Sequence, residues 1–225
     1  MAKHCFVDES GTVAHQEIMT VALVMLEGGR TAEKLHPKLT KLAFRKPKLR
    51  GLKELERWYE TRELHFINLS DAEKLAIGQE LAKANIKAFV GYCKHTDESC
   101  AHEHRHLMYT ELLKTTIHKA YEVEEDLVIS IGKQGGSDIY GPPLLRALRE
   151  IPQVLSAGGT YRRGNFFLAS PSKQGQQISD FYASASWHYL QSGGDANRSG
   201  AFDLIKHQLC LEEISLETKE LVKEK

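Results

Sequence analysis

The sequence predicts an α/β domain whose mixed β-sheet opens with an antiparallel hairpin and is flanked by helices. Two apolar runs near the N-terminus, at residues 5–8 and 16–26, are separated by turn-forming residues, which is typical of a hairpin. Beyond them, short apolar segments alternate with amphipathic ones. A chain of 225 residues, 41% of them hydrophobic, is long enough to bury one sizeable core.

The hairpin begins with Cys-Phe-Val-Asp at residues 5–8, a short strand that ends on an acidic residue. Glu9-Ser10-Gly11-Thr12 follows as a turn, because serine and glycine are both turn formers. The second strand is rich in Val, Ile, Met and Leu, and Gly28-Gly29 ends it. Thr31 is then expected to cap a helix.

The remaining elements follow from apolar periodicity and capping signals. Ser70 or Asp71 should cap a helix that runs to about Lys83. We expect further helices near 104–122, 144–149 and 174–190, and strands at 86–93, 127–131 and 165–169. Residues 1–212 are predicted to form a single domain, followed by a charged helical tail at 213–225.

Composition narrows the classes of protein that fit. Thirty Lys and Arg balance thirty Asp and Glu, so the sequence does not indicate a globally basic nucleic-acid binder. A local basic patch is still compatible with a net charge of zero. No segment approaches the roughly 20 apolar residues that span a bilayer. Four sparse cysteines and the lack of a signal-peptide core predict free thiols and a cytoplasmic protein. Phosphate-loop, dinucleotide and Gly-x-Ser-x-Gly fingerprints are missing from the sequence.

Carboxylates recur in three segments that could carry chemistry. Asp8 and Glu9 stand at the end of the first strand, Glu63 and His65 share one face of an extended segment, and Asp180 lies on the helix at 174–190. Each segment alone is typical of a turn, a strand or a helix cap. Together they could hold two hard cations about 3.5–4 Å apart, the arrangement that stabilises the attacking and leaving oxygens of a phosphodiester. A nearby histidine could move a proton.

The same segments resemble the motifs of the domain-of-unknown-function 3800 family. That family opens with a strand close to Tyr-Ile-Asp-Glu-Ser-Gly, has a central Glu-Leu-His, and closes with a helix reading Leu-Gln-Leu-Ala-Asp-Phe, often after Ser-Lys. The corresponding residues here are Phe6-Val7-Asp8-Glu9-Ser10-Gly11, Glu63-Leu64-His65, Ser172-Lys173 and Gln177-Ile178-Ser179-Asp180-Phe181. They occur in the same order and span residues 6–181.

The resemblance implies a ribonuclease H-like fold and a metal-dependent nuclease that uses Mg²⁺ or Mn²⁺. By this resemblance, Asp8 would bridge the metal ions with Glu9 beside it. Glu63 and His65 would line the site, and Asp180 would project into it from the last helix. The expected metal ligands are thus Asp8, Glu9, Glu63 and Asp180. The expected catalytic group adds His65 and Lys173 to these four.

From its position just before the last acidic helix, Lys173 is expected to contact the scissile phosphate. The sequence departs from the family pattern at one place. Many relatives place an acid at the end of the strand that here ends in Gly132-Lys133, and the nearest acid downstream is Asp138. The departure leaves open an alternative, a catalytically weak or inactive module that binds nucleic acid or protein on the same scaffold.

A basic run from Arg45 to Arg57 is the best electrostatic match for a nucleic-acid partner, DNA or RNA. Its expected phosphate contacts are Arg45, Lys46, Lys48 and Arg50. Trp58 and Tyr59 follow and could stack on an unpaired base. A solvated loop and helix face, balanced by nearby glutamates, explains the run equally well.

The segment from Cys93 to His106 is rich in residue types that bind zinc. Its candidate ligands are Cys93, His95, Cys100 and His102, with His102 and His106 as a weaker helical pair. The spacing matches no standard paired-cysteine site. A buried thiol at Cys93, at the end of a strand, is therefore the favoured interpretation.

Overall fold

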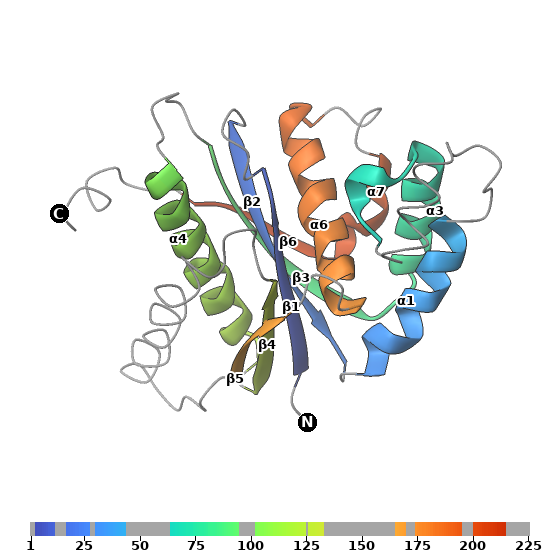
Figure 1. The fold of residues 1–225 in the computed structure, drawn as a ribbon, viewed down its shortest axis with the longest axis horizontal. Coiled ribbons are helices and arrows are strands. Elements are labelled where there is room, and N and C mark those ends of the chain that lie inside the picture. Colours follow the sequence, from blue (N-terminus) through green and yellow to red (C-terminus); the bar gives the residue numbers. More distant parts are fainter. Residues whose placement is uncertain are drawn as a thin grey trace.

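The computed structural model describes residues 3–11, 17–27, 30–43, 64–94, 102–124, 126–132, 165–169, 174–194 and 200–214. Its strands are β1 (Lys3–Ser10), β2 (Ile18–Leu26), β3 (Ile86–Lys94), β4 (Leu127–Gly132), β5 (Asn165–Ala169) and β6 (Leu209–Glu213). Its α-helices are α1 (Arg30–Ala43), α3 (Asp71–Leu81), α4 (His102–Tyr121), α6 (Gln174–Gln191) and α7 (Gly200–Ile205). Two 3-10 turns, η2 (Phe66–Asn68) and η3 (Lys206–Gln208), complete the set. Figure 1 shows the arrangement of these elements.

The strands form one mixed sheet in the order β5-β4-β1-β2-β3-β6. The hairpin predicted from the sequence is confirmed, since β1 pairs with β2 in antiparallel fashion and β2 pairs likewise with β3. On the other side β1 pairs in parallel with β4, and β4 with β5. The strand that carries the first acidic motif is therefore central and has a neighbour on each side.

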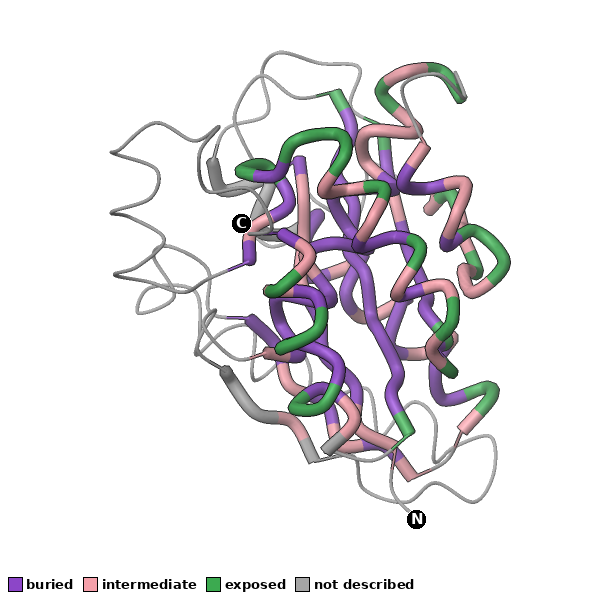
Figure 2. Tube along the Cα trace, turned by 90° about the vertical axis from the view of Figure 1, so that its right-hand side faces the viewer, coloured by how far each residue is buried: buried purple, intermediate pink, exposed green. Residues whose placement is uncertain are grey.

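Helices cover both faces of the sheet, as predicted. Helix α4 lies on one face, whereas α6, α1, α3 and α7 lie on the other (Figure 1). Side chains of β1 alternate between the two layers, with Phe6 in the α6 layer and Val7 in the α4 layer. Every residue of β2 is buried, which fits a strand covered on both faces. Figure 2 shows this buried interior beneath more exposed helix surfaces.

Helix α6 approaches the sheet closely because its inner face is built from small residues. A Cβ on Gly175 would lie 2.3 Å from the ring of Phe6, so only glycine fits there. The hydroxyl oxygen of Ser179 lies 3.0 Å from the carbonyl oxygens of both Phe6 and Ala22. This close contact fixes the position of α6 relative to the end of β1.

The predicted N-cap of helix α3 is confirmed, whereas the predicted N-cap of α1 is wrong. Ser70 caps α3 in a full capping box with Glu73, as the sequence predicts. The prediction that Thr31 caps α1 is wrong. The helix begins at Arg30. The Thr31 hydroxyl instead donates a hydrogen bond to the carbonyl oxygen of Glu27.

The C-terminal part contains elements that the sequence did not predict. Helix α7 begins at Gly200, and β6 adds a parallel edge strand beside β3. Strand β6 runs to Glu213, through the domain boundary expected at residue 212. The helix expected at 144–149 and most of the expected tail lie outside the described residues. None of the helices in the described ranges is long and apolar enough to cross a membrane.

Candidate functional site

Asp8 lies near the end of the central strand, where three strands come together. It pairs with Ala22 of β2, and the register of β1 with β4, in which Val7 faces Ile131, places it level with Gly132. Strand alternation directs Asp8 to the same face as Phe6, which packs in the α6 layer. The Asp8 side chain is therefore oriented toward helix α6.

Asp180 reaches this place from helix α6. Its Oδ2 accepts a hydrogen bond of 2.9 Å from the backbone N–H of Phe66, and its Oδ1 accepts one of 3.2 Å from the Ser184 hydroxyl. Only 18% of its side chain is exposed. Asp180 is close enough to Asp8 for its charge to act on the Asp8 carboxyl. Two acids far apart in the sequence thus meet at the end of β1.

The surroundings disfavour the simultaneous ionisation of these acids. Burial raises the pKa of Asp8 well above its ordinary value, and the negative charges of Glu9 and Asp180 raise it further. The backbone N–H of Glu9, 3.0 Å from Asp8 Oδ1, opposes this rise. Burial also raises the pKa of Asp180, against the opposing effects of the Phe66 N–H, His65 and the Ser184 hydroxyl. A bound cation would offset this concentration of negative charge.

His65 borders the same group of acids. Its Nδ1 lies 3.9 Å from Asp180 Oδ2, and 39% of its side chain is exposed. The backbone at His65 is extended, as the sequence predicts, with φ −103° and ψ 129°. The neighbouring Phe66 ring packs edge-on against Phe181, with 5.1 Å between ring centroids. The second motif is thus held against the helix that carries the third.

Gln177 fastens this second segment to α6, a role that the sequence did not reveal. Its Oε1 accepts hydrogen bonds from the backbone N–H of Leu64 at 2.7 Å and from Nε2 of His36 at 2.6 Å. Gln177 and Asp180 together hold two main-chain N–H groups, those of Leu64 and Phe66. The only signal in the sequence was that this glutamine belongs to the same short motif as Asp180.

Two more buried polar side chains lie beside the acids. Gln176, 1% exposed, donates from Nε2 to the carbonyl oxygen of Ser130 at 2.9 Å. Tyr109 of α4 approaches from the other layer. Burial raises the pKa of its phenol, and the charges of Glu9 and Asp8 raise it further. Neither residue was singled out from the sequence, because a glutamine and a tyrosine on amphipathic helices carry no distinguishing pattern.

The structure brings together Asp8, Glu9, His65 and Asp180 of the predicted site residues. Glu63 and Lys173 lie outside the described residues, as do Arg45, Lys46, Lys48 and Arg50 of the basic run. Within the described ranges, no group of three or more His, Cys, Asp or Glu side chains is arranged to hold a metal ion. The donors present at the site are oxygen atoms, the type that Mg²⁺ and Mn²⁺ prefer. They therefore suit a hard divalent cation, although acidic groups alone do not complete a three-ligand set there.

Cys93 is buried in the layer between the sheet and α4, together with Met19 and Met108. Its position agrees with the favoured interpretation of a core thiol. The side chains of the other candidate zinc ligands, up to His106, lie outside what the structure describes. The zinc hypothesis for that segment therefore stays a prediction.

Comparisons with known proteins add little to this geometry. No family model and no curated protein matches the chain. The chain is similar to a solved chain from the complex of PCNA with RNase HII from Archaeoglobus fulgidus, with a TM-score of 0.48 and 12% identity over 86% of this chain and 79% of that chain. The function is therefore inferred from the residues of the chain itself.

Proposed function

We propose that this chain is a metal-dependent nuclease that hydrolyses phosphodiester bonds in DNA or RNA. One observation carries the proposal: Asp8 and Asp180 come from distant parts of the sequence and meet, with Glu9, in partly buried surroundings that disfavour their ionisation. Clusters of this kind occur at functional sites more often than elsewhere, because crowding charge without compensation is destabilising.

The proposed ligands of the cation are Asp8, Glu9, Glu63 and Asp180. Mg²⁺ or Mn²⁺, when bound, would offset the charge of these carboxylates and of the phosphate oxygens and would activate water for in-line attack at phosphorus. These carboxylates would hold the cation beside the end of β1. Hydrogen bonds from Phe66 and Ser184 orient Asp180 for this role.

His65 is proposed to assist proton transfer at the rim of the site. It is partly exposed, so its ring can exchange protons with solvent, and its Nδ1 lies 3.9 Å from Asp180 Oδ2. Lys173, which directly precedes the first residue of α6 in the sequence, is proposed to contact the scissile phosphate. Arg45, Lys46, Lys48 and Arg50 are proposed to contact the phosphates of the nucleic acid on either side.

We also propose that the fold is ribonuclease H-like and that the chain belongs to the domain-of-unknown-function 3800 family. Two features support this. The mixed sheet opens with a hairpin and has its first strand at the centre. Moreover, β1, residues 64–66 and α6, which carry residues of the three ordered motifs, lie against one another around the end of that strand.

A binding module without catalysis is the second candidate, and Gly132 favours it. Gly132 lies level with Asp8 at the end of β4 and supplies no carboxylate. A site with one acid fewer would bind a cation more weakly. The same surface could then serve recognition alone.

The two candidates are separated by cleavage assays with the full chain on labelled single- and double-stranded DNA and RNA. We expect the parent protein to cut at least one substrate with Mn²⁺ or Mg²⁺ and to stop when the metal is chelated. Asp8→Asn and Asp180→Asn should abolish cleavage and keep the fold, because the amide preserves the shape of each side chain. Asp203→Asn is the matched control, since Asp203 forms an exposed ion pair of 3.0 Å with Lys206 away from the site.

Three results of this assay are decisive. If Asp8→Asn and Asp180→Asn cut as fast as the parent, the site is misassigned. If the parent cuts no substrate but still retains nucleic acid in a binding assay, the chain is a binding module. If cleavage is lost only in the two site variants, the nuclease proposal stands.

A further inference from the structure

The side-chain oxygen of Gln176 is buried and accepts no hydrogen bond from the described residues. Gln176 is 1% exposed, and Oε1 has no hydrogen-bond partner in the described part of the chain. The other end of the same amide is satisfied, because Nε2 donates to the carbonyl oxygen of Ser130. This bond also fixes the orientation of the amide and therefore the direction of Oε1. An unsatisfied buried acceptor is costly, so a missing partner is indicated.

The neighbouring glutamine shows that burial alone does not explain this. Gln177 is 2% exposed, yet its Oε1 accepts hydrogen bonds from Leu64 and His36. The two glutamines are adjacent on α6 and equally buried. They differ in what their oxygens face, a backbone N–H and a histidine for Gln177 and the end of β1 for Gln176.

Oε1 of Gln176 faces a spot bordered by oxygen atoms. A Cβ on Gly132 would lie 3.4 Å from Gln176 Oε1, from Asp8 Oδ1 and from the carbonyl oxygen of Val7, and these are its three nearest neighbours. All three oxygens are acceptors when Asp8 is ionised. A place lined in this way attracts a cation or a proton donor rather than another acceptor.

The geometry points to Gln176 Oε1 as a neutral ligand of the divalent cation, completing a set with the carboxylates of Asp8 and Asp180. This inference rests on the proposed function and adds to it a ligand from outside the acidic motifs. Carboxylate and carbonyl oxygens are both suited to Mg²⁺ and Mn²⁺. The amide oxygen would supply the third donor that acidic residues do not provide among the described residues.

Because Gln176 is a neutral ligand, adding a charged ligand at residue 132 should raise the affinity of the site for the cation. The amide adds a donor without adding charge, and the number of charged ligands is one of the factors that set cation affinity. At 3.4 Å, an added Cβ on Gly132 makes only ordinary van der Waals contacts. The Cβ of an aspartate at residue 132 would lie 3.4 Å from both proposed ligand oxygens, so its carboxylate would lie near the cation. An acidic residue there should therefore raise the affinity for the cation.

Loss of the amide oxygen is the first test, with Mn²⁺ alone as the probe and no nucleic acid. Gln176→Met keeps an unbranched side chain of similar length and removes the oxygen. We expect the dissociation constant measured by isothermal titration calorimetry to rise by about tenfold or more, as for other groups that shape a metal site. Asp8→Asn is measured in parallel and should lose binding. Circular dichroism in chelator checks that each variant is folded.

Gain of a carboxylate is the second test and does not disturb the bond from Gln176 to Ser130. Gly132→Asp should bind Mn²⁺ about tenfold more tightly than Gly132→Ala, which adds the Cβ without the oxygens. Gly132→Ala is the reference for the steric effect of the Cβ alone. Equal affinity of Gly132→Asp and Gly132→Ala would show that residue 132 does not face the cation and would overturn the inference.

A third measurement observes the amide directly. In ¹⁵N spectra, the side-chain NH₂ of Gln176, identified by its disappearance in Gln176→Met, should shift on titration with diamagnetic Mg²⁺. The side-chain NH₂ of Gln177 is the internal control and should move little. A Gln176 signal that stays in place at saturating Mg²⁺ would contradict ligation by its oxygen.

The failures are distinguishable. If Gln176→Met binds Mn²⁺ within twofold of the parent while Asp8→Asn loses binding, the role of Gln176 is refuted and the proposed metal site is retained. If the parent itself binds no Mn²⁺ at millimolar concentration, both proposals are refuted. Weakened binding in Gln176→Met together with tightened binding in Gly132→Asp supports the inference.

Discussion

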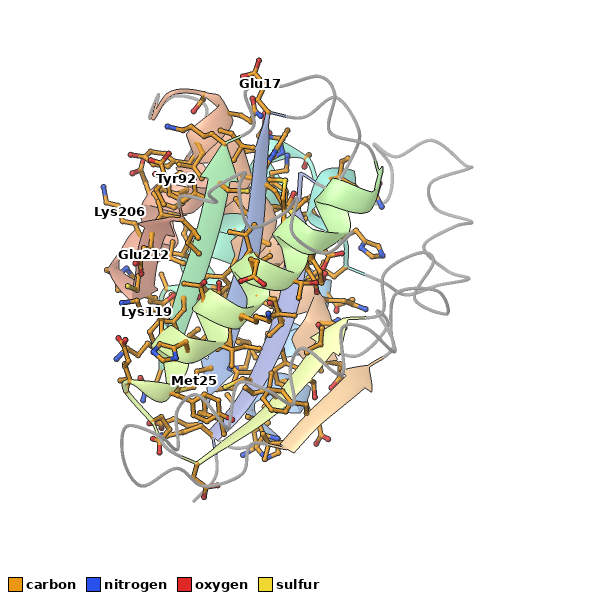
Figure 3. The ribbon with its side chains drawn as sticks, turned by 90° about the vertical axis from the view of Figure 1, so that its left-hand side faces the viewer. Glu17, Met25, Tyr92, Lys119, Lys206 and Glu212 are labelled. Carbon is orange, nitrogen blue, oxygen red and sulfur yellow. The ribbon has the colours of Figure 1, made fainter. Side chains whose placement is uncertain are left out.

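The two layers on either side of the sheet are built from different chemistry. The α4 layer is mostly apolar, with Leu112, Leu113 and Ile117 packed on Val21 and Leu23. Figure 3 looks onto this layer and shows α4 crossing the strands. At its rim, Lys119 of α4 lies beside Glu212 of β6, with 3.8 Å between Nζ and Oε2.

The α6 layer has buried polar groups at the same depth. Ser179, Thr20 and Trp187 all make hydrogen bonds to main-chain carbonyl oxygens between α6 and the hairpin. Apolar packing tolerates exchange of similar residues, whereas a buried hydrogen bond requires particular atoms at particular places. Apolar packing in both layers supplies stability, and the buried hydrogen bonds of the α6 layer also fix the geometry around Asp8 and Asp180.

The largest of the effects considered is expected from truncating a core side chain of the α4 layer. Leu112→Ala removes a fully buried side chain and should lower the free energy of unfolding by about 3 kcal/mol. Its affinity for Mn²⁺ should remain that of the parent, because α4 packs on the opposite face. Urea unfolding and calorimetric titration check the two expectations. A large loss of Mn²⁺ affinity would show that the layers are not separable in this way.

Metal binding should have the next largest effect on stability, and it should depend on the carboxylates of the site rather than on the apolar packing of α4. At 100 times the dissociation constant, Mn²⁺ should stabilise the parent by about 2.7 kcal/mol, which is roughly 5–10 °C in Tm for a chain of this size. Leu112→Ala should keep this increase in Tm and Asp180→Asn should lose it. Thermal unfolding followed by circular dichroism, with and without Mn²⁺, provides the comparison. An undiminished increase in Asp180→Asn would place the cation elsewhere.

The smallest effect on stability is expected in the absence of metal, and there the site variant should be more stable than the parent. Because folding raises the pKa of Asp8, its ionised form opposes folding at neutral pH, and this cost disappears as the pH falls through the raised pKa toward the unfolded value of about 3.9. In chelator, Asp8→Asn should therefore have a higher Tm than the parent at pH 8. The difference should shrink on acidification. A lower Tm for Asp8→Asn at pH 8 would contradict the assigned direction.

Elements with strong local signals could be predicted from the sequence. Strand β5 and helix α6 agree with the expected residues 165–169 and 174–190 to within one residue, and the Ser70 cap is present. Strand β6 could not be predicted. It has only five residues, they are partly exposed, and the strand is stabilised by pairing with β3, which is distant in the sequence. Thr31 was misassigned because a threonine near a helix start can bond backward along the chain as well as cap.

The candidate site divides in the same way. Asp8, Glu9, His65 and Asp180 could be singled out because they lie in short motifs with a fixed order. Gln176 could not, because a glutamine becomes informative only when its burial and the unused bonding capacity of its oxygen are known. Glu63 stays a prediction, since it lies outside the described residues.

The hydrogen bond from the Phe66 N–H to Asp180 has a consequence of its own. The same carboxylate that faces Asp8 also tethers the main chain beside His65, so a change in its charge acts on both partners at once. A proton on Asp180 would loosen the tether, and amide hydrogen exchange at Phe66 would then quicken. That single amide is thus a built-in reporter of the ionisation state of Asp180.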